Sequence, residues 1–337
     1  MSRLVVINLG SGDLQLGCPS ITAQISHPEE SRRAMQFRGS LPPAPEIEHL
    51  YDLWQLLYEA FYRMRSLRSS PDFEIIPSGM ITHFSEVEFR QLCQQVHTQL
   101  NAWLTSETFL NIDQQVRSQL NPTEEIRVII ETDDDRLLQL PWHCWNFFRD
   151  YRRAELALSR PEYKQREASP SKISRKKIRI LAILGSSEGI DLSAEQQFLE
   201  ALPDSETQFL VQPDRREFNT QLWDEQGWDI LLFAGHSCAE GEDGRIYINE
   251  KPTHNSLTIE ELEEALGAAI DRGLKLSIFN SCSGLGLANA LAKLDIPQVI
   301  VMREPVPNLG GAGILQILSD GFCRAAIAAL SGGAGSP

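Results

Sequence analysis

Positive charge is scarce in this sequence. The 337 residues include 31 Lys and Arg against 46 Asp and Glu, which gives a formal net charge of -15 at pH 7. Broad binding to nucleic acid or to an anionic membrane needs a basic surface. We therefore expect neither nucleic acid nor a membrane among the partners, although a local basic patch is compatible with this composition.

Long apolar runs and paired cysteines are also missing. No segment approaches the ~18 apolar residues of a membrane span, and residues 1–8 lack the apolar region of a signal peptide. The six cysteines are widely spaced and form no CxxC motif. In a chain of this length they indicate reduced thiols rather than a disulfide framework. We therefore expect a cytoplasmic protein.

The remaining composition is that of an ordinary globular protein, with 42% hydrophobic and 23% charged residues. The length favours two domains. Residues 1–120 are expected to form a smaller α+β extension of unknown role. Its predicted strands cover residues 4–8, 21–25 and 35–37, and its helices 47–64 and 86–104.

Residues 125–337 are expected to form a second domain. Strands are predicted at 126–131 and 154–158, before an exposed, Pro- and Lys-rich loop at 160–176. Strands and helices then alternate. The strands are at 178–184, 209–211, 229–234, 274–279 and 298–302, and the helices at 193–202, 218–223, 258–272 and 285–294, with a hairpin near 245–248. Capping boxes open two helices, at Ser193 and Thr258. This alternation predicts a mainly parallel sheet in a three-layer α/β/α arrangement.

Two reactive side chains follow strands of this predicted sheet. Strand 229–234 runs into Gly235-His236-Ser237, and strand 274–279 runs into Asn280-Ser281-Cys282. Parallel strands end at the same edge of a sheet, which is where α/β proteins bind ligands. A histidine and a cysteine are therefore expected to meet there.

This pair suits nucleophilic catalysis by a thiol. The thiolate is the reactive form of cysteine, and a nearby imidazole can take the proton and return it to a leaving amine. Cys282 also precedes a predicted helix, whose N-terminus favours a thiolate. The backbone N–H groups of Ser237 and Cys282 are candidate oxyanion donors. The other interpretation is that the cysteine is a small core residue and the histidine a hydrogen-bonded polar residue.

Three other motifs contain residues of possible chemical interest. Cys238 is a second thiol near His236, but a neighbour two residues along the same loop points poorly toward the ring, so Cys282 is preferred. Gly10-Ser-Gly12 with Gly17 lacks the spacing of a dinucleotide-binding loop. His143-Cys144 lacks further ligands at zinc spacing. We therefore expect no cofactor and no metal.

Three segments together resemble the CHAT domain, a caspase-like family related to separases and metacaspases and common in cyanobacterial multidomain proteins. They are Phe233–Ser237, Phe279–Gly284 and Val301–Pro307. Residues 126–131 and 140–142, followed by the strand at 178, resemble the family's entry segment. Residues 1–120 resemble the N-terminal extension of cyanobacterial members.

The resemblance implies a caspase-like fold, with His236 as general base and acid and Cys282 as nucleophile. The chain departs from related families at two positions: Ser237 replaces the usual caspase glycine, and Asn280 replaces the acid of metacaspases. A substrate pocket is expected from Asn280, Arg303 and Glu304, with Glu304 available to a basic side chain. After Pro307 the family's closing helices and strand are replaced by a glycine-rich end, in which one helix is expected at 314–330.

Three hypotheses about function remain open. The first is a caspase- or separase-like cysteine endopeptidase that acts on a protein substrate, with a regulatory protein as a further partner. The second is a non-catalytic CHAT-type signalling or scaffold module. The third is a truncated, latent peptidase, because the sheet is expected to stop at 298–302. On that basis the chain alone is expected to have weak activity or none.

Overall fold

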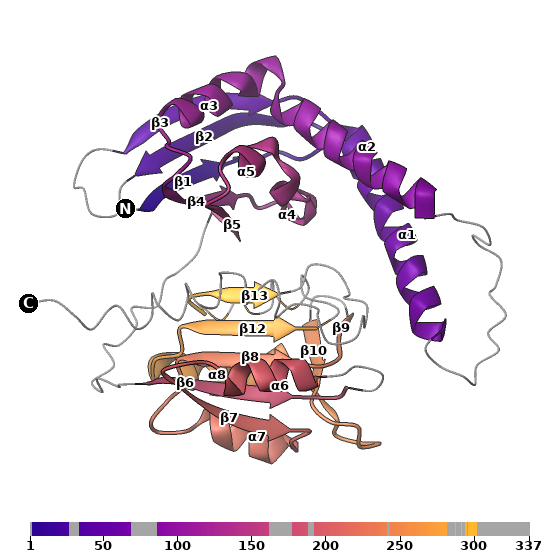
Figure 1. The fold of residues 1–337 in the computed structure, drawn as a ribbon, viewed down its shortest axis with the longest axis vertical. Coiled ribbons are helices and arrows are strands. Elements are labelled where there is room, and N and C mark those ends of the chain that lie inside the picture. The colour runs from indigo at the N-terminus through magenta and orange to yellow at the C-terminus, as the bar shows by residue number, and fades with distance from the viewer. Residues whose placement is uncertain are drawn as a thin grey trace, which may run out of the picture. The chain divides into compact units, whose positions relative to one another are not determined.

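The structure, a computed structural model, describes most of the chain. The described residues are 2–26, 34–68, 86–161, 177–187, 192–240, 243–281, 287, 291, 294 and 296–301. They form two compact units: the first holds nearly all described residues up to 161, and the second holds those from 177 onward (Figure 1).

The first unit is built on a five-stranded mixed sheet. Its strands are β1 (Ser2–Asn8), β2 (Cys18–Ser26), β3 (Met35–Leu41), β4 (Glu125–Glu131) and β5 (Ala154–Ser159), in the order β3-β2-β1-β4-β5. β1 is antiparallel to β2 and parallel to β4, and β4 is parallel to β5. Residues 125–159 thus share a sheet with residues 2–41. The predicted division into 1–120 and 125–337 stays a prediction, since one family domain can contain two compact units.

Helices accompany this sheet. They are α1 (Pro45–Arg68), α2 (Glu86–Leu104), α3 (Glu107–Ser118) and the short α4 (Asp135–Gln139), η1 (Trp142–Cys144) and α5 (Asn146–Asp150). The sequence analysis missed α3, which buries Phe109, Ile112 and Val116. It packs closely on β3: a Cβ added at Gly39 would lie 2.8 Å from Ile112 Cδ1.

The second unit contains a five-stranded, wholly parallel sheet. Its strands are β6 (Ile178–Leu184), β7 (Ser205–Val211), β8 (Ile230–Ala234), β12 (Leu276–Asn280) and β13 (Val299–Val301), in the order β13-β12-β8-β6-β7. All four neighbouring pairs are parallel. The near-continuous apolar runs of β6 and β8 are typical of strands that are buried on both faces.

Two separate hydrophobic cores lie against the two faces of this sheet. α6 (Ser193–Glu200) contributes Leu199 to one core, which contains Ile180, Leu232 and Ile278. α7 (Arg215–Leu222) and α8 (Ile259–Asp271) cover the other face, which contains Ile183, Phe233 and Phe279. The alternation of neighbouring residues between the two cores follows from the two-residue period of a strand. The predicted three-layer α/β/α arrangement is confirmed.

One of the two predicted capping boxes forms. At α8 the Thr258 hydroxyl accepts from the Glu261 N–H at 3.1 Å, while a Glu261 carboxylate oxygen accepts from the Thr258 N–H at 2.9 Å. At α6 the prediction was wrong: Ser193 is the first helical residue, and the cap position belongs to Leu192, whose side chain cannot accept. A Ser-x-x-Gln spacing therefore forms no capping box when the helix begins at the serine itself instead of at the residue after it.

A small antiparallel sheet follows β8. It consists of β9 (Ser237–Glu240), β10 (Asp243–Tyr247) and β11 (Ser256–Thr258), in the order β11-β10-β9. The predicted hairpin near 245–248 is β10 with its neighbours. This sheet begins directly after His236 and so determines where the backbone leaves the end of β8.

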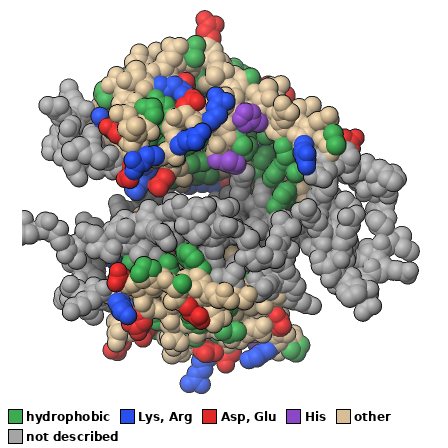
Figure 2. Space-filling model, in the orientation of Figure 1, with side chains coloured by type: hydrophobic (Ala, Val, Ile, Leu, Met, Phe, Trp, Pro, Cys, Tyr) green, Lys and Arg blue, Asp and Glu red, His purple; other side chains and the backbone are tan. Residues whose placement is uncertain are grey.

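Several predicted features lie outside the described residues. They are most of the loop at 160–176, most of the helix at 285–294, the helix at 314–330 and the glycine-rich end after 307. Within the described part, no helix combines the length and the apolar character needed to cross a bilayer. Figure 2 shows acidic side chains beside basic ones on the visible face.

Candidate active site at the carboxyl edge of the parallel sheet

Three neighbouring strands end level with one another. Leu184 of β6 is in register with Ala234 of β8, and Ala234 is in register with Asn280 of β12. β6 pairs with β7 on one side and with β8 on the other, so the strand order reverses at β6. Ligands of open α/β sheets bind outside the carboxyl ends of the strands at such a point. In the sequence, His236 and Ser237 follow the end of β8, and Cys282 follows the end of β12.

The backbone of His236 is held in a closed ring of three hydrogen bonds. The His236 N–H donates to the Ser186 carbonyl at 2.9 Å, the Ser186 N–H donates to the Tyr247 carbonyl at 2.8 Å, and the Tyr247 N–H donates to the His236 carbonyl at 3.0 Å. The ring joins the end of β6, the end of β8 and β10. The backbone of His236 is therefore fixed by Ser186 and by Tyr247, and the residue is half-buried.

Two glycines allow these backbones to approach. A Cβ added at Gly185 would collide with the Tyr247 carbonyl oxygen and lie 2.9 Å from Phe233 Cε2. Gly235 has a φ of +154° and would place a Cβ 2.9 Å from the Ser186 carbonyl oxygen. Any other L-residue at Gly235 would be both strained and crowded. Both glycines thus serve contacts within the protein around the backbone of His236.

The position of Ser237 in the β9–β10 ladder determines which way its backbone N–H faces. The Tyr247 N–H donates to the carbonyl of His236, and Ser237 is opposite Ile246 in the ladder. In an antiparallel pair, hydrogen-bonded positions alternate with positions whose N–H groups point away from the partner strand. The N–H of Ser237 therefore points away from β10. Its side chain is buried.

The rival thiol of Cys238 has a different neighbour. Its Sγ is 3.5 Å from the hydroxyl oxygen of Tyr247, a distance at which either group can act as donor. Cys238 is also in register with Arg245 of β10. The Cys238 thiol thus has a neighbour within the small sheet, and the preference for Cys282 stays a prediction.

The structure describes only part of the predicted pocket. Asn280 is half-buried at the end of β12, and the N–H of Gly235 donates to its carbonyl oxygen at 3.2 Å. Ser281 is buried, and its Oγ has no hydrogen-bond partner among the described residues. Cys282, Arg303 and Glu304 lie outside the described residues. The dyad and the pocket therefore stay predictions.

Side chains that could bind a metal are dispersed in the described part of the chain. Among the described residues there is no group of three or more His, Cys, Asp or Glu side chains that could hold a metal ion. Of the described cysteines, Cys18 is the best shielded. Burial raises the pKa of its thiol to about 11, with smaller contributions from Asp134 and Asp13. Cys18 is therefore an unreactive core thiol.

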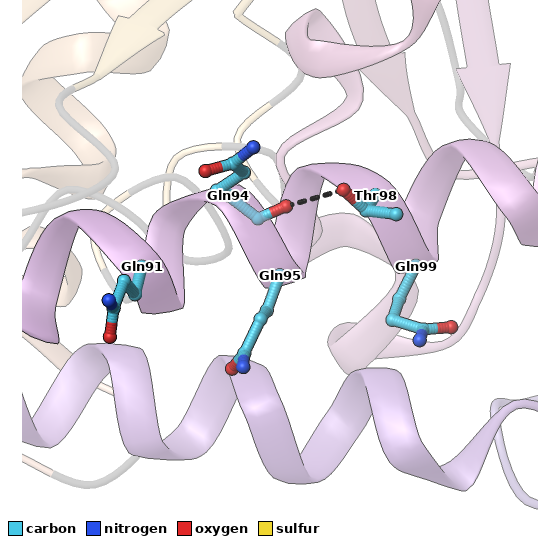
Figure 3. Close-up of a pocket in the computed structure, with 5 residues that line it drawn as sticks. All are labelled: Gln91, Gln94, Gln95, Thr98 and Gln99. Atoms are coloured by element: carbon cyan, nitrogen blue, oxygen red, sulfur yellow. Dashed lines mark hydrogen bonds between the residues drawn. The ribbon is translucent and has the colours of Figure 1, made fainter.

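In the first unit, a groove lies along α2. It has a volume of about 360 Å³ and is lined by Gln91, Gln94, Gln95, Thr98 and Gln99. Figure 3 shows the side chains of Gln91, Gln95 and Gln99 along one side of the helix, and the Thr98 hydroxyl donates to the Gln94 carbonyl at 2.8 Å. The lining side chains offer amides and a hydroxyl, with neither a nucleophilic thiol nor a titratable base. The described lining of the groove therefore consists of hydrogen-bonding groups.

The second unit therefore has a three-layer α/β architecture with a histidine at the carboxyl edge of a parallel sheet, as in caspase-like proteins. Residues 90–331 match the CHAT domain family, and this chain belongs to that family. The CHAT domain family is caspase-like and related to peptidases. The match begins within α2 and continues through the second unit. No curated protein matches the chain.

Proposed function

We propose that the chain is a caspase- or separase-like cysteine endopeptidase with His236 and Cys282 as its catalytic dyad. The observation that carries this proposal is the register of Ala234 with Asn280. His236 is two residues after Ala234, and Cys282 is two residues after Asn280. Neighbouring strands are about 4.8 Å apart. Two residues that each come two positions after such a registered pair are therefore candidates for direct contact.

Parity along the strands supports the same pairing. Successive strand residues face opposite sides of a sheet. Ala234 belongs to the core on the α6 side, while Phe233 and Phe279 belong to the opposite core. By this alternation Ala234 and Asn280, the last residues of β8 and β12, lie on the α6 side, and His236 and Cys282 each come two residues later in the sequence. The imidazole and the thiol are thus proposed to share one face as well as one level.

The proposed reaction is acyl transfer. His236 takes the proton of Cys282, and the thiolate attacks the carbonyl carbon of the scissile peptide bond. The N–H groups of Ser237 and Cys282 stabilise the oxyanion. The His236 imidazolium then protonates the leaving amine, and a water molecule, deprotonated by the same ring, hydrolyses the thioester. No metal or cofactor is needed for this sequence of steps.

The proposed substrate is a protein in the cytoplasm, and a regulatory protein is the further partner that we propose. Asn280, Arg303 and Glu304 are proposed to form the pocket for the residue before the scissile bond. Glu304 would receive a basic side chain there. A preference for aspartate at that position would contradict this part, because a buried contact between like charges is costly.

A peptide-library cleavage assay tests the proposal. The full chain is compared with Cys282→Ala, His236→Ala and the matched thiol control Cys238→Ala. We expect both dyad variants to lose about 10³-fold or more in rate, while Cys238→Ala retains the wild-type rate. Cleavage by Cys282→Ala at the wild-type rate would refute the assignment. If the folded wild-type chain is as inactive as the dyad variants, the result would favour the scaffold or latent alternative.

A further inference from the structure

A cysteine–histidine contact lies in the first unit, between residues that the proposed dyad does not include. Cys144 Sγ is 3.3 Å from Nε2 of His143. Cys144 is half-buried and His143 is exposed. A thiol within hydrogen-bonding distance of an imidazole can transfer its proton to the ring and become a thiolate. The position thus combines a nucleophile, a base and access from solvent.

The backbone around this pair is firmly held. His143 and Cys144 lie between the buried side chains of Trp142 and Trp145, and the Trp145 N–H donates to the Trp142 carbonyl at 2.9 Å. The Trp142 indole N–H donates to the Leu137 carbonyl at 2.7 Å. The two residues are therefore displayed on a short turn that is anchored at both ends.

A buried amide fixes the same turn from the side of α2. Asn101, 7% exposed, donates from Nδ2 to the Cys144 carbonyl at 2.9 Å and accepts at Oδ1 from the Asn146 N–H at 2.8 Å. Both hydrogen-bonding ends of one buried side chain thus hold the chain on either side of Trp145. The position of the Cys144 backbone depends on this contact as well as on the tryptophans.

The other described thiols differ in their surroundings. Cys18 is fully buried, with a pKa raised to about 11 by burial. Cys93 Sγ accepts from the Trp54 indole N–H at 3.3 Å, and Cys238 Sγ is 3.5 Å from the Tyr247 hydroxyl. Neither the indole nor the phenol is a base at neutral pH. Among the described cysteines, Cys144 is the one for which a contact with an imidazole is seen.

We propose that Cys144 is a reactive thiol, activated by His143, that is modified by soft electrophiles and is oxidised by peroxides. In the reaction with hydrogen peroxide, the thiolate sulfur forms a bond to one peroxide oxygen and the O–O bond breaks. The leaving hydroxide takes the proton from the His143 imidazolium and becomes water. Cysteine is oxidised to sulfenic acid, and the peroxide is the group that is reduced. This chemistry does not depend on the proposed peptidase site.

Site-resolved mass spectrometry of the full chain tests this inference. Iodoacetamide measures the alkylation rate of each cysteine, and hydrogen peroxide followed by dimedone detects sulfenic acid. We expect Cys144 to be alkylated faster than Cys18 and to give a dimedone adduct. His143→Gln, which removes the base, should slow both reactions at Cys144 by about tenfold.

His49→Ala is the matched control, because it removes an exposed histidine from α1. It should leave the Cys144 rates unchanged, and circular dichroism checks that each variant remains folded. Equal Cys144 rates in the wild-type chain and in folded His143→Gln would overturn the proposal. So would the absence of a dimedone adduct at Cys144 under conditions that oxidise an added model thiol.

Discussion

The backbone N–H of His236 donates to the carbonyl oxygen of Ser186 at 2.9 Å, which ties the end of β8 to the end of β6. Fifty positions separate the two residues in the sequence. The bond is one side of the ring that Tyr247 closes, and it fixes the backbone of the proposed catalytic histidine before any substrate is present. A fixed position favours catalysis, because the entropy of the catalytic group is already lost on folding. Substrate binding then does not have to supply the free energy for ordering it.

Gly185→Ala should break this ring. The added methyl would collide with the Tyr247 carbonyl and lie 2.9 Å from the Phe233 ring. Crowding of this kind costs about 1–3 kcal/mol, and it should lower the urea midpoint of the second unit together with any peptidase activity. Gly267→Ala, in the middle of α8, is the matched substitution and should raise the stability by up to about 1 kcal/mol. Equal midpoints for Gly185→Ala and wild type would contradict the packing described for this ring.

Ser277→Ala should be neutral or stabilising. Ser277 is fully buried in β12, and its Oγ has no hydrogen-bond partner among the described residues. Burial of an unpaired hydroxyl costs about 1–3 kcal/mol, so its removal should keep or raise the urea midpoint. A drop of more than about 1 kcal/mol would show that the hydroxyl has a partner.

The alkaline stability of the first unit should depend on Cys18. Its thiol pKa is raised from 9.0 to about 11, chiefly by burial. A raised pKa means that the folded state favours the protonated thiol. The resulting contribution to the free energy of unfolding is present below pH 9 and is lost as the pH rises toward 11. The contribution amounts to roughly 2–3 kcal/mol.

Denaturation of wild type and Cys18→Ala across this pH range provides the measurement. Cys18→Ala should be less stable near neutral pH because it leaves a cavity. The difference in free energy of unfolding between Cys18→Ala and wild type should shrink between pH 9 and 11. A constant difference over that interval would contradict the raised pKa of Cys18.

Much of the second unit could be predicted from the sequence because its signals are local. The apolar runs of β6 and β8 and the capping box at Thr258 each occupy a few consecutive residues, and the parallel arrangement follows from their alternation with helices. The placement of His236 at a strand end followed from the same local pattern.

The contacts that hold His236 were not predictable in this way. They join Ser186, His236 and Tyr247, and no local pattern indicates which distant carbonyl a backbone N–H will meet. The pairing of β1 with β4 is likewise long-range. α3 was missed because its apolar face consists of only a few residues, and the Ser193 box failed because its helix begins one residue early.

The most direct test of the proposed dyad is the labelling of Cys282 by a peptide-based electrophile that reacts once with a catalytic thiol. Such labelling reports activation of the thiol even in a chain with slow turnover. It is measured on the Cys282 peptide by mass spectrometry in wild type, His236→Ala and Cys238→Ala. The dyad predicts strong labelling in wild type and Cys238→Ala and a loss of labelling in His236→Ala. Equal labelling of Cys282 in folded His236→Ala would contradict it.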